Sequence, residues 1–298
     1  MPDRNKFPFA EDTGVHTIYA DFSKPQHPNY IADLVYANHD GIDLHIQMLT
    51  QAQPGDRLPC LVYVQGSGWG KQRTQLFLPK MVPFAVAGYV VACVEYRTSA
   101  QAPFPAQIQD TRAAVRFLRA NAQAYGINPD HIALMGDSSG GHTVLMAALA
   151  DGSIEDTPDY PEYSSAVNCV IDFYGPTDML ASGLDQRWKD MPEDRRKEFV
   201  FRAQTDAEMK ALIQKGNPLS YISTDRPLPP LLIMHGDRDP VVPFNQSVIL
   251  YEKLRETGHD VEFYKVLGAG HGVGFWIEPV YDAVKAFLRA YIYTGFVK

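Results

Sequence analysis

The sequence predicts an α/β fold in which helices cover both faces of a mostly parallel central sheet. The first indication is a series of short apolar runs that alternate with longer helical segments from residue 60 onward. Runs without polar alternation are typical of parallel strands that are buried on both faces. They comprise residues 60–64, 89–94, 131–135, 167–174, 231–234 and 261–266.

Two strands of another kind are predicted before these runs, at 31–37 and 42–49. A short polar turn, Asn38-His39-Asp40-Gly41, joins them. An Asp-Gly pair between two strand patterns indicates an antiparallel hairpin. The sheet is therefore expected to begin with an N-terminal antiparallel hairpin.

Helical periodicity supports the segments between the strands. Steps of three and four residues place one set of side chains on a single helix face: Ile108, Thr111, Val115, Leu118 and Ala122. Three basic residues are expected on the opposite, solvated side: Arg112, Arg116 and Arg119. Later helices are predicted over 244–256, ending before Gly258, and over 278–291.

One stretch interrupts this alternation. Between Gly175 and Ser220 there is no buried-strand signal, and the sequence is charged and helical in character. We therefore expect a single domain over 1–298 with a small helical cap or lid insertion at about 176–220, above the active site. A surface insertion without a role is the alternative.

Composition limits the classes of function. The chain has 298 residues and a net charge of −8, from 27 basic and 35 acidic residues. No block of Lys and Arg marks a nucleic-acid surface, and no apolar stretch has the length of a membrane span. The N-terminal segment lacks the apolar region of a signal peptide, so a cytoplasmic location is expected, although a processed secreted chain has the same appearance.

The three cysteines lie inside apolar, strand-like runs, as Cys60, Cys93 and Cys169. An odd number without C-x-x-C spacing predicts neither a disulfide framework nor a zinc site. They are expected to be buried free thiols. Nothing in the sequence indicates the oligomeric state.

The segment Gly136-Asp137-Ser138-Ser139-Gly140 matches the pattern G-x-S-x-G. It follows the apolar run 131–135 and precedes a helical run of small residues, 141–150. A serine between a buried strand and a helix lies on a sharp turn that exposes its hydroxyl at the carboxyl edge of the sheet. Glycines flank it because a Cβ would clash in so tight a turn. Ser138 is therefore the predicted nucleophile.

A serine hydroxyl needs a base, and the base needs a group that orients it. In hydrolases with this type of sheet, the acid and then the histidine follow the serine along the chain. Asp239 comes after the run 231–234, and His271 comes after the run 261–266, between glycines. We therefore predict that Ser138, Asp239 and His271 form a catalytic triad.

Other residues of the same types are expected to have structural roles. Asp237 shares the loop of Asp239 but lies nearer the strand end, where it is expected to accept hydrogen bonds from loop amides. His142 is one helical turn beyond Ser138 and is expected to be packed, and His235 ends its strand. No His, Asp or Glu grouping has metal-ligand spacing, so no metal and no cofactor is expected.

Hydrolysis at a carbonyl also requires hydrogen-bond donors for the oxyanion that develops there. One predicted donor is the backbone N–H of Ser139, the residue after the nucleophile. The others are expected from Ser67 and Gly68, in the glycine-rich loop after the first parallel strand. Trp69 of the same loop is expected to line the substrate pocket.

With these motifs the chain resembles the α/β-hydrolase superfamily. It is most similar to hormone-sensitive-lipase-like carboxylesterases and to the feruloyl and acetylxylan esterases of gut bacteria. The resemblance covers roughly residue 58 to the C-terminus, without the insertion at 176–216. The similar stretches are 90–97, 104–142, 230–247 and 267–272.

The chain departs from this family in one motif. The family usually has H-G-G-G-W or H-G-G-x-W in the oxyanion loop, where this chain has Gln65-Gly66-Ser67-Gly68-Trp69. Because the donors are backbone amides, the oxyanion hole can survive both changes. The Gln65 amide is expected to hold the loop as the histidine does.

The resemblance implies a serine carboxylesterase that forms an acyl-enzyme on small or carbohydrate-linked esters, such as acetyl or feruloyl groups. The expected partner is thus a small-molecule or oligosaccharide ester, and neither nucleic acid nor membrane. Two alternatives remain: an amidase, formamidase or prolyl-peptidase-like hydrolase of the same fold, and a binding protein without catalysis. Four aromatic residues either line the pocket or pack in the core: Trp69, Trp188, Phe199 and Phe201.

Overall fold

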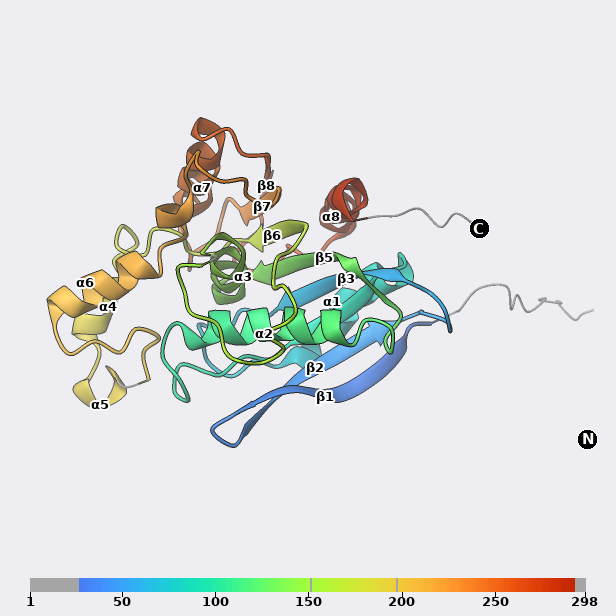
Figure 1. Cartoon of the computed structure of the whole chain (residues 1–298). Helices are drawn as coiled ribbons and strands as arrows, with labels where there is room; N and C mark the ends of the chain where they lie inside the picture. The colour runs from blue at the N-terminus through green and yellow to red at the C-terminus, as the bar shows by residue number, and fades with distance from the viewer. Residues whose placement is uncertain (1–26, 151, 197, 293–298) are drawn as a thin grey trace, which may run out of the picture.

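An eight-stranded sheet forms the centre of the computed structural model, which describes residues 27–150, 152–196 and 198–292 (Figure 1). Its strand order is β1-β2-β4-β3-β5-β6-β7-β8. β2 pairs antiparallel with both β1 and β4, and all other neighbours are parallel. This confirms the predicted α/β class. The strands are β1 (Asn29–His39), β2 (Ile42–Thr50), β3 (Leu58–Val64), β4 (Val90–Val94), β5 (Ile127–Asp137), β6 (Cys169–Phe173), β7 (Leu231–Gly236) and β8 (Val261–Val266).

Helices cover both faces of this sheet. Alternate side chains of β3 show the two layers, because Val62 packs in the core with α2, α3 and α7, and Tyr63 packs in the core with α1 and α8. Cys60, Cys93 and Cys169 are all buried free thiols, as expected. The helices are α1 (Thr74–Val86), α2 (Ala106–Ala120), α3 (Ser139–Leu149), α7 (Asn245–Glu256) and α8 (Glu278–Tyr291).

Local sequence signals account for several boundaries. Asp40 and Gly41 both have positive φ, of 53° and 80°, which fits a two-residue hairpin turn between β1 and β2. α7 ends before Gly258, which has φ of 78°, and α8 covers the residues predicted for it. The predicted hairpin and both late helices are therefore confirmed.

The edge strand β8 differs from the prediction. Its apolar run suggested burial on both faces, yet none of the residues from Val261 to Val266 is fully buried. β8 pairs only with β7 and ends the sheet, so one side and part of its faces remain open to solvent.

The solvated basic face predicted for α2 is also wrong for two of its three arginines. Arg112 and Arg116 are only 1% and 3% exposed. The segment 154–159 passes over this face, and Asp156 contacts Arg112 at 3.1 Å and Arg116 at 2.8 Å. Carbonyl oxygens of Ala147, Ile154, Thr157 and Asp159 accept further hydrogen bonds from the two guanidinium groups. A helical period cannot reveal that a distant loop will cover the polar face.

Residues 176–222 form short helices at the end of the sheet toward which β5 and β6 point (Figure 1). These are α4 (Leu184–Asp190), α5 (Glu193–Arg196), α6 (Asp206–Lys215) and the 3₁₀ turn η2 (Pro218–Tyr221). Trp188 and Phe201 anchor this segment, because both are buried in the core cluster shared with α2 and α3.

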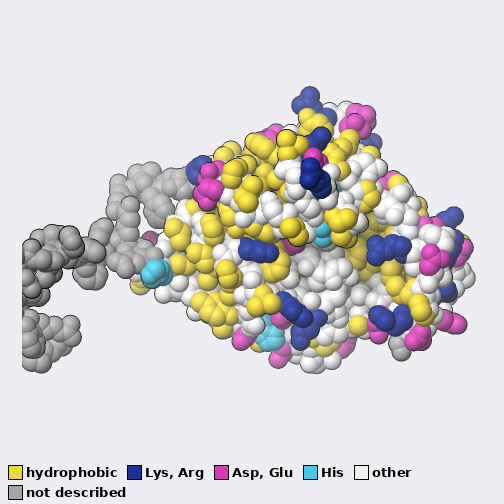
Figure 2. Space-filling model, turned by 180° about the vertical axis from the view of Figure 1, so that it is seen from behind, with side chains coloured by type: hydrophobic (Ala, Val, Ile, Leu, Met, Phe, Trp, Pro, Cys, Tyr) yellow, Lys and Arg dark blue, Asp and Glu magenta, His cyan; other side chains and the backbone are white. Residues whose placement is uncertain are grey.

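The molecular surface is mixed in charge. Figure 2 shows Lys and Arg side chains scattered among acidic and apolar ones over the face seen from behind, without a single basic block. In the described ranges, no helix has the length and apolar character that crossing a bilayer requires.

Candidate active site

The turn at Ser138 joins β5 directly to α3. Ser138 has φ of 53° and ψ of −125°, a region that residues with a Cβ rarely adopt. Tight packing holds this conformation: a Cβ on Gly136 would lie 2.3 Å from the carbonyl oxygen of Gly140, and one on Gly140 would lie 2.1 Å from that of Val64. The glycines of the G-x-S-x-G motif are therefore required by contacts that the turn makes with itself and with β3.

Ser138 and His271 are brought together from loops 133 residues apart in the chain. The Ser138 Oγ lies 2.9 Å from His271 Nε2, and His271 Nδ1 lies 2.7 Å from Asp239 Oδ2. Because a carboxylate only accepts, Nδ1 carries a proton toward Asp239, which leaves Nε2 to accept the serine proton. The three residues predicted as a triad thus form one continuous hydrogen-bonded chain.

The Asp239 carboxylate is shielded from solvent and fully hydrogen-bonded. Oδ1 accepts from the amides of Val241 and Val242, at 2.7 and 3.0 Å. Burial alone would raise the pKa of Asp239, but the hydrogen bonds from His235, His271 and these amides hold its pKa well below the usual value. Asp239 is therefore ionised and can stabilise a positive charge on His271.

The competing acid, Asp237, has a different environment. Its Oδ1 accepts a hydrogen bond from the Gly268 amide at 2.6 Å, which links the loop after β7 to the loop after β8. This agrees with the loop-holding role expected for it.

Of the other two histidines considered, His142 is packed as expected and His235 has an additional contact. His142 is buried against Trp69, its Nε2 bonds to the Gly216 carbonyl, and burial lowers its pKa to about 4. His235 Nε2 lies 3.3 Å from Asp239, a contact that the sequence did not predict. Tyr174 was also missed, and its ring lies 4.8 Å from that of His271. Its only signal in the sequence is its place immediately after β6.

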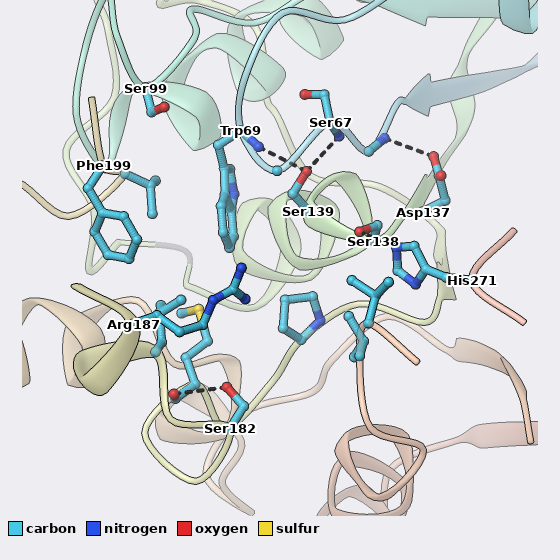
Figure 3. A pocket seen from close by; sticks show the side chains of 18 of the residues that line it. Ser67, Trp69, Ser99, Asp137, Ser138, Ser139, Ser182, Arg187, Phe199 and His271 are labelled. Atoms are coloured by element: carbon cyan, nitrogen blue, oxygen red, sulfur yellow. Dashed lines mark hydrogen bonds between the residues drawn. The ribbon is translucent and has the colours of Figure 1, made fainter. Parts of the chain in front are cut away.

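Two neighbours of Ser138, the predicted nucleophile, hold the loop 65–70, which is the predicted oxyanion loop (Figure 3). Asp137 Oδ1 accepts hydrogen bonds from the Tyr63 hydroxyl and, at 2.9 Å, from the Gly66 amide. The Ser139 hydroxyl oxygen accepts from the amides of Ser67 and Trp69, at 2.9 and 3.2 Å. The variable positions of the G-x-S-x-G motif thus position a loop that lies some 70 residues earlier in the chain.

This arrangement decides which loop amides are free. Ser67 was predicted to donate its N–H to the oxyanion. In the structure this N–H donates to the Ser139 hydroxyl oxygen instead, so it is not free for that role. The Gly68 N–H donates to no acceptor within the described part of the chain. The N–H of Ser139, in the first turn of α3, has no intrahelical acceptor.

The departures from the family motif are accommodated by further hydrogen bonds. Gln65 Oε1 accepts from the Arg73 amide at 2.8 Å, so this side chain holds the loop as expected. The Ser67 hydroxyl donates to the Gly70 carbonyl at 2.7 Å and lies 3.0 Å from the Tyr96 hydroxyl. Both substituted side chains therefore point into the loop's own scaffold.

A cavity of about 910 Å³ opens above Ser138. Its walls come from the oxyanion loop, the segment 176–200 and residues 240–243. Trp69 and Phe199 line it, whereas Trp188 and Phe201 do not and instead pack in the core. Among residues 27–150, 152–196 and 198–292, no group of His, Cys, Asp and Glu is placed to hold a metal ion.

Comparison with protein-family models shows which family the chain belongs to. The model of the family described as BD-FAE matches residues 44–254, which include Ser138 and Asp239. The chain belongs to the BD-FAE family. This membership, with the esterases below, confirms the resemblance to α/β-hydrolase esterases.

Several named proteins are similar to this BD-FAE member. Esterase LipQ of Mycobacterium tuberculosis is 29% identical over 220 residues, 73% of this chain and 51% of LipQ. Esterase LipC of the same organism is 28% identical over 250 residues, 79% of this chain and 59% of LipC. The chain therefore spans about half the length of the curated relatives it matches.

Solved structures show the same fold. A truncated carbohydrate esterase from gut microbiota has a TM-score of 0.74 and 26% identity, over 89% of this chain and 96% of that one. The thermophilic esterase Est2 of Thermogutta terrifontis, with propionate bound, has a TM-score of 0.72 and 23% identity, over 91% and 97% of the two chains.

Proposed function

We propose that this chain is a serine carboxylesterase. The observation that carries the proposal is the hydrogen-bonded chain from Ser138 through His271 to Asp239. Ser138 and His271 line the 910 Å³ cavity. The esterase names of its relatives and its family membership support the same reaction.

In the proposed mechanism, His271 Nε2 takes the Ser138 proton as the oxygen attacks the ester carbonyl carbon. The tetrahedral intermediate places its negative oxygen between the free amides of Gly68 and Ser139, at the N-terminus of α3. His271 then gives its proton to the departing alcohol oxygen, which leaves an acyl-Ser138. Water, activated by the same imidazole, attacks the acyl carbon and releases the acid.

The proposed substrates are esters of small acyl groups, including groups linked to carbohydrate. The cavity has the size that binds small molecules, and apolar side chains, among them Trp69 and Phe199, form part of its walls. Similarity to a carbohydrate esterase of gut microbiota supports a sugar-linked alcohol. The insertion at about 176–220 is proposed as a cap on a single domain, since Met179, Leu184 and Val200 of this segment line the cavity.

Hydrolysis of 4-nitrophenyl acetate tests this function. The wild-type chain should release nitrophenol with saturation kinetics, and Ser138→Ala should lower kcat by a factor of about 10⁴ or more. Circular dichroism and thermal unfolding serve as controls that both proteins are folded. A folded wild-type chain without turnover, on this ester and on longer acyl esters, would overturn the proposal.

A further inference from the structure

One charged side chain in the walls of the cavity has no partner among the residues that the structure describes. Asp137 is held by Tyr63 and Gly66, and His271 by Asp239. The remaining ionisable wall residues are Arg187, Arg195 and Glu198, and the last two contact each other at 3.3 Å. The Arg187 guanidinium forms no ion pair or hydrogen bond with any residue that the structure describes.

The other arginines of the same insertion all form hydrogen bonds or ion pairs with described residues. Arg196 donates to the carbonyls of Lys189 and Met191 and lies over the Trp188 ring. Arg202 donates to the carbonyls of Ser99 and Ala100. The free guanidinium of Arg187 is therefore an exception within this segment.

The base of the Arg187 side chain is fixed. Arg187 lies in α4, where its amide donates to the Gly183 carbonyl at 3.0 Å. The neighbouring Trp188 and, one turn earlier, Leu184 are buried and anchor the helix. Figure 3 shows the Arg187 guanidinium directed into the pocket, on the side where Trp69 and Phe199 lie.

The surroundings of this cation favour a planar anion. Arg187 is exposed to solvent, and the apolar side chains of Met179, Leu184 and Phe199 line the same cavity, so a charge pair formed here remains open to screening by salt. A guanidinium matches a carboxylate in shape and can donate two parallel hydrogen bonds to it. The cavity thus offers an unpaired donor for a carboxylate, although the chain as a whole carries a net charge of −8.

The position of His271 indicates which part of the substrate lies near Arg187. His271 must give a proton to the leaving alcohol, so the alcohol portion lies on the His271 side of Ser138. Figure 3 shows Trp69, Phe199 and Arg187 on the other side of Ser138 from His271. The acyl portion therefore extends toward Arg187.

We infer that Arg187 binds a carboxylate at the far end of the acyl group, so that half-esters of dicarboxylic acids are a preferred substrate class. This inference rests on the proposed esterase function. The reaction itself is unchanged: water cleaves the acyl–oxygen bond, and the products are the alcohol and a dicarboxylate.

Two acyl esters and two variants test the inference. The substrates are mono-4-nitrophenyl adipate, which ends in a carboxylate, and the neutral 4-nitrophenyl hexanoate. Arg187→Met should lower the adipate-to-hexanoate ratio of kcat/KM by about three- to fivefold, mainly through KM, because an exposed, charge-assisted hydrogen bond is lost. Lys189→Met removes the same charge from the same helix, but this lysine pairs with Asp206 at 3.0 Å and does not line the cavity, so the ratio should stay constant.

Ionic strength gives a second readout. Higher salt should reduce the adipate preference of the wild-type chain and leave the ratio of Arg187→Met constant, because salt screens exposed charge pairs. An equal ratio in the wild type and Arg187→Met would overturn the inference. So would an Arg187 dependence that appears with 4-carboxyphenyl hexanoate, where the carboxylate is on the alcohol. If the wild type hydrolyses none of these esters, the proposed function fails instead.

Discussion

His235 and His271 contact the same oxygen of Asp239, at 3.3 and 2.7 Å. His235 is completely buried, and its Nε2 also lies 3.0 Å from the Val242 carbonyl. Because a carbonyl only accepts, Nε2 carries a proton and donates to both oxygens, while Nδ1 accepts from Ser247. His235 therefore helps to fix the carboxylate that orients the proposed base.

Removal of this second histidine should impair catalysis. We expect His235→Leu to lower kcat for 4-nitrophenyl butyrate by about tenfold, because a buried hydrogen bond to a charged group is lost. His235→Gln can still donate to Asp239 and should recover part of the loss. Thermal unfolding of both variants provides the control for folding. Equal activity of the Leu, Gln and wild-type proteins would exclude a positioning role.

The choice between the two aspartates can be tested directly. Asp239→Asn should lower kcat by about 10⁴, because an amide can favour the wrong imidazole tautomer. Asp237→Asn is the matched control in the same loop, because among the described residues the only hydrogen-bond partner of the Asp237 side chain is the Gly268 amide. It should reduce kcat by less than about tenfold, the cost of one neutral hydrogen bond. If Asp237→Asn proves the more damaging, the acid has been assigned to the wrong residue.

The Ser139 hydroxyl should contribute to catalysis in addition to its backbone amide. Ser139→Ala keeps the amide but removes the acceptor for the Ser67 and Trp69 N–H groups, which hold Gly68 in place. We expect kcat to fall by about tenfold with the fold intact. Ser99→Ala is a control, because Ser99 lines the same cavity and its hydroxyl has no partner among the described residues. A loss that is equal in the two variants would contradict this role.

Asp172 should make stability depend on pH. Burial raises its pKa to about 7, and its Oδ2 lacks a hydrogen-bond partner among the described residues. A carboxyl with a raised pKa favours the fold when protonated, so this contribution is present below about pH 4 and is lost as pH rises toward 7. Between these two pH limits, the contribution of Asp172 to the free energy of unfolding changes by about 4 kcal/mol at most.

Urea unfolding at pH 5 and pH 8 measures this effect. The stability of Asp172→Asn relative to the wild type should be higher at pH 8 than at pH 5, because the wild type then contains a buried charge. The same difference at both pH values would show that Asp172 does not titrate in this range.

The chain order of strands, the elbow and the two loops that follow β7 and β8 could be predicted because each depends on local pattern. Apolar runs mark the strands, and glycines mark the turn at Ser138. By contrast, the burial of Arg112 depends on the segment 154–159, which folds over α2 from a distant part of the chain.

The same limit applies within the site. The roles of Asp137 and Ser139 depend on the approach of a loop from β3, and no spacing in the sequence encodes that contact. Trp188 and Phe199 are close in sequence and similar in character, yet only Phe199 faces the cavity. Which aromatic residue faces the substrate is decided by the packing of the insertion against the core.

Covalent labelling of Ser138 tests the central proposal most directly. A fluorophosphonate should phosphonylate the wild-type chain once, abolish ester hydrolysis in proportion, and give a modified peptide whose added mass maps to Ser138 by tandem mass spectrometry. Ser138→Ala should remain unlabelled. Labelling of another residue, or full activity after Ser138 is modified, would contradict the assignment of Ser138 as the nucleophile.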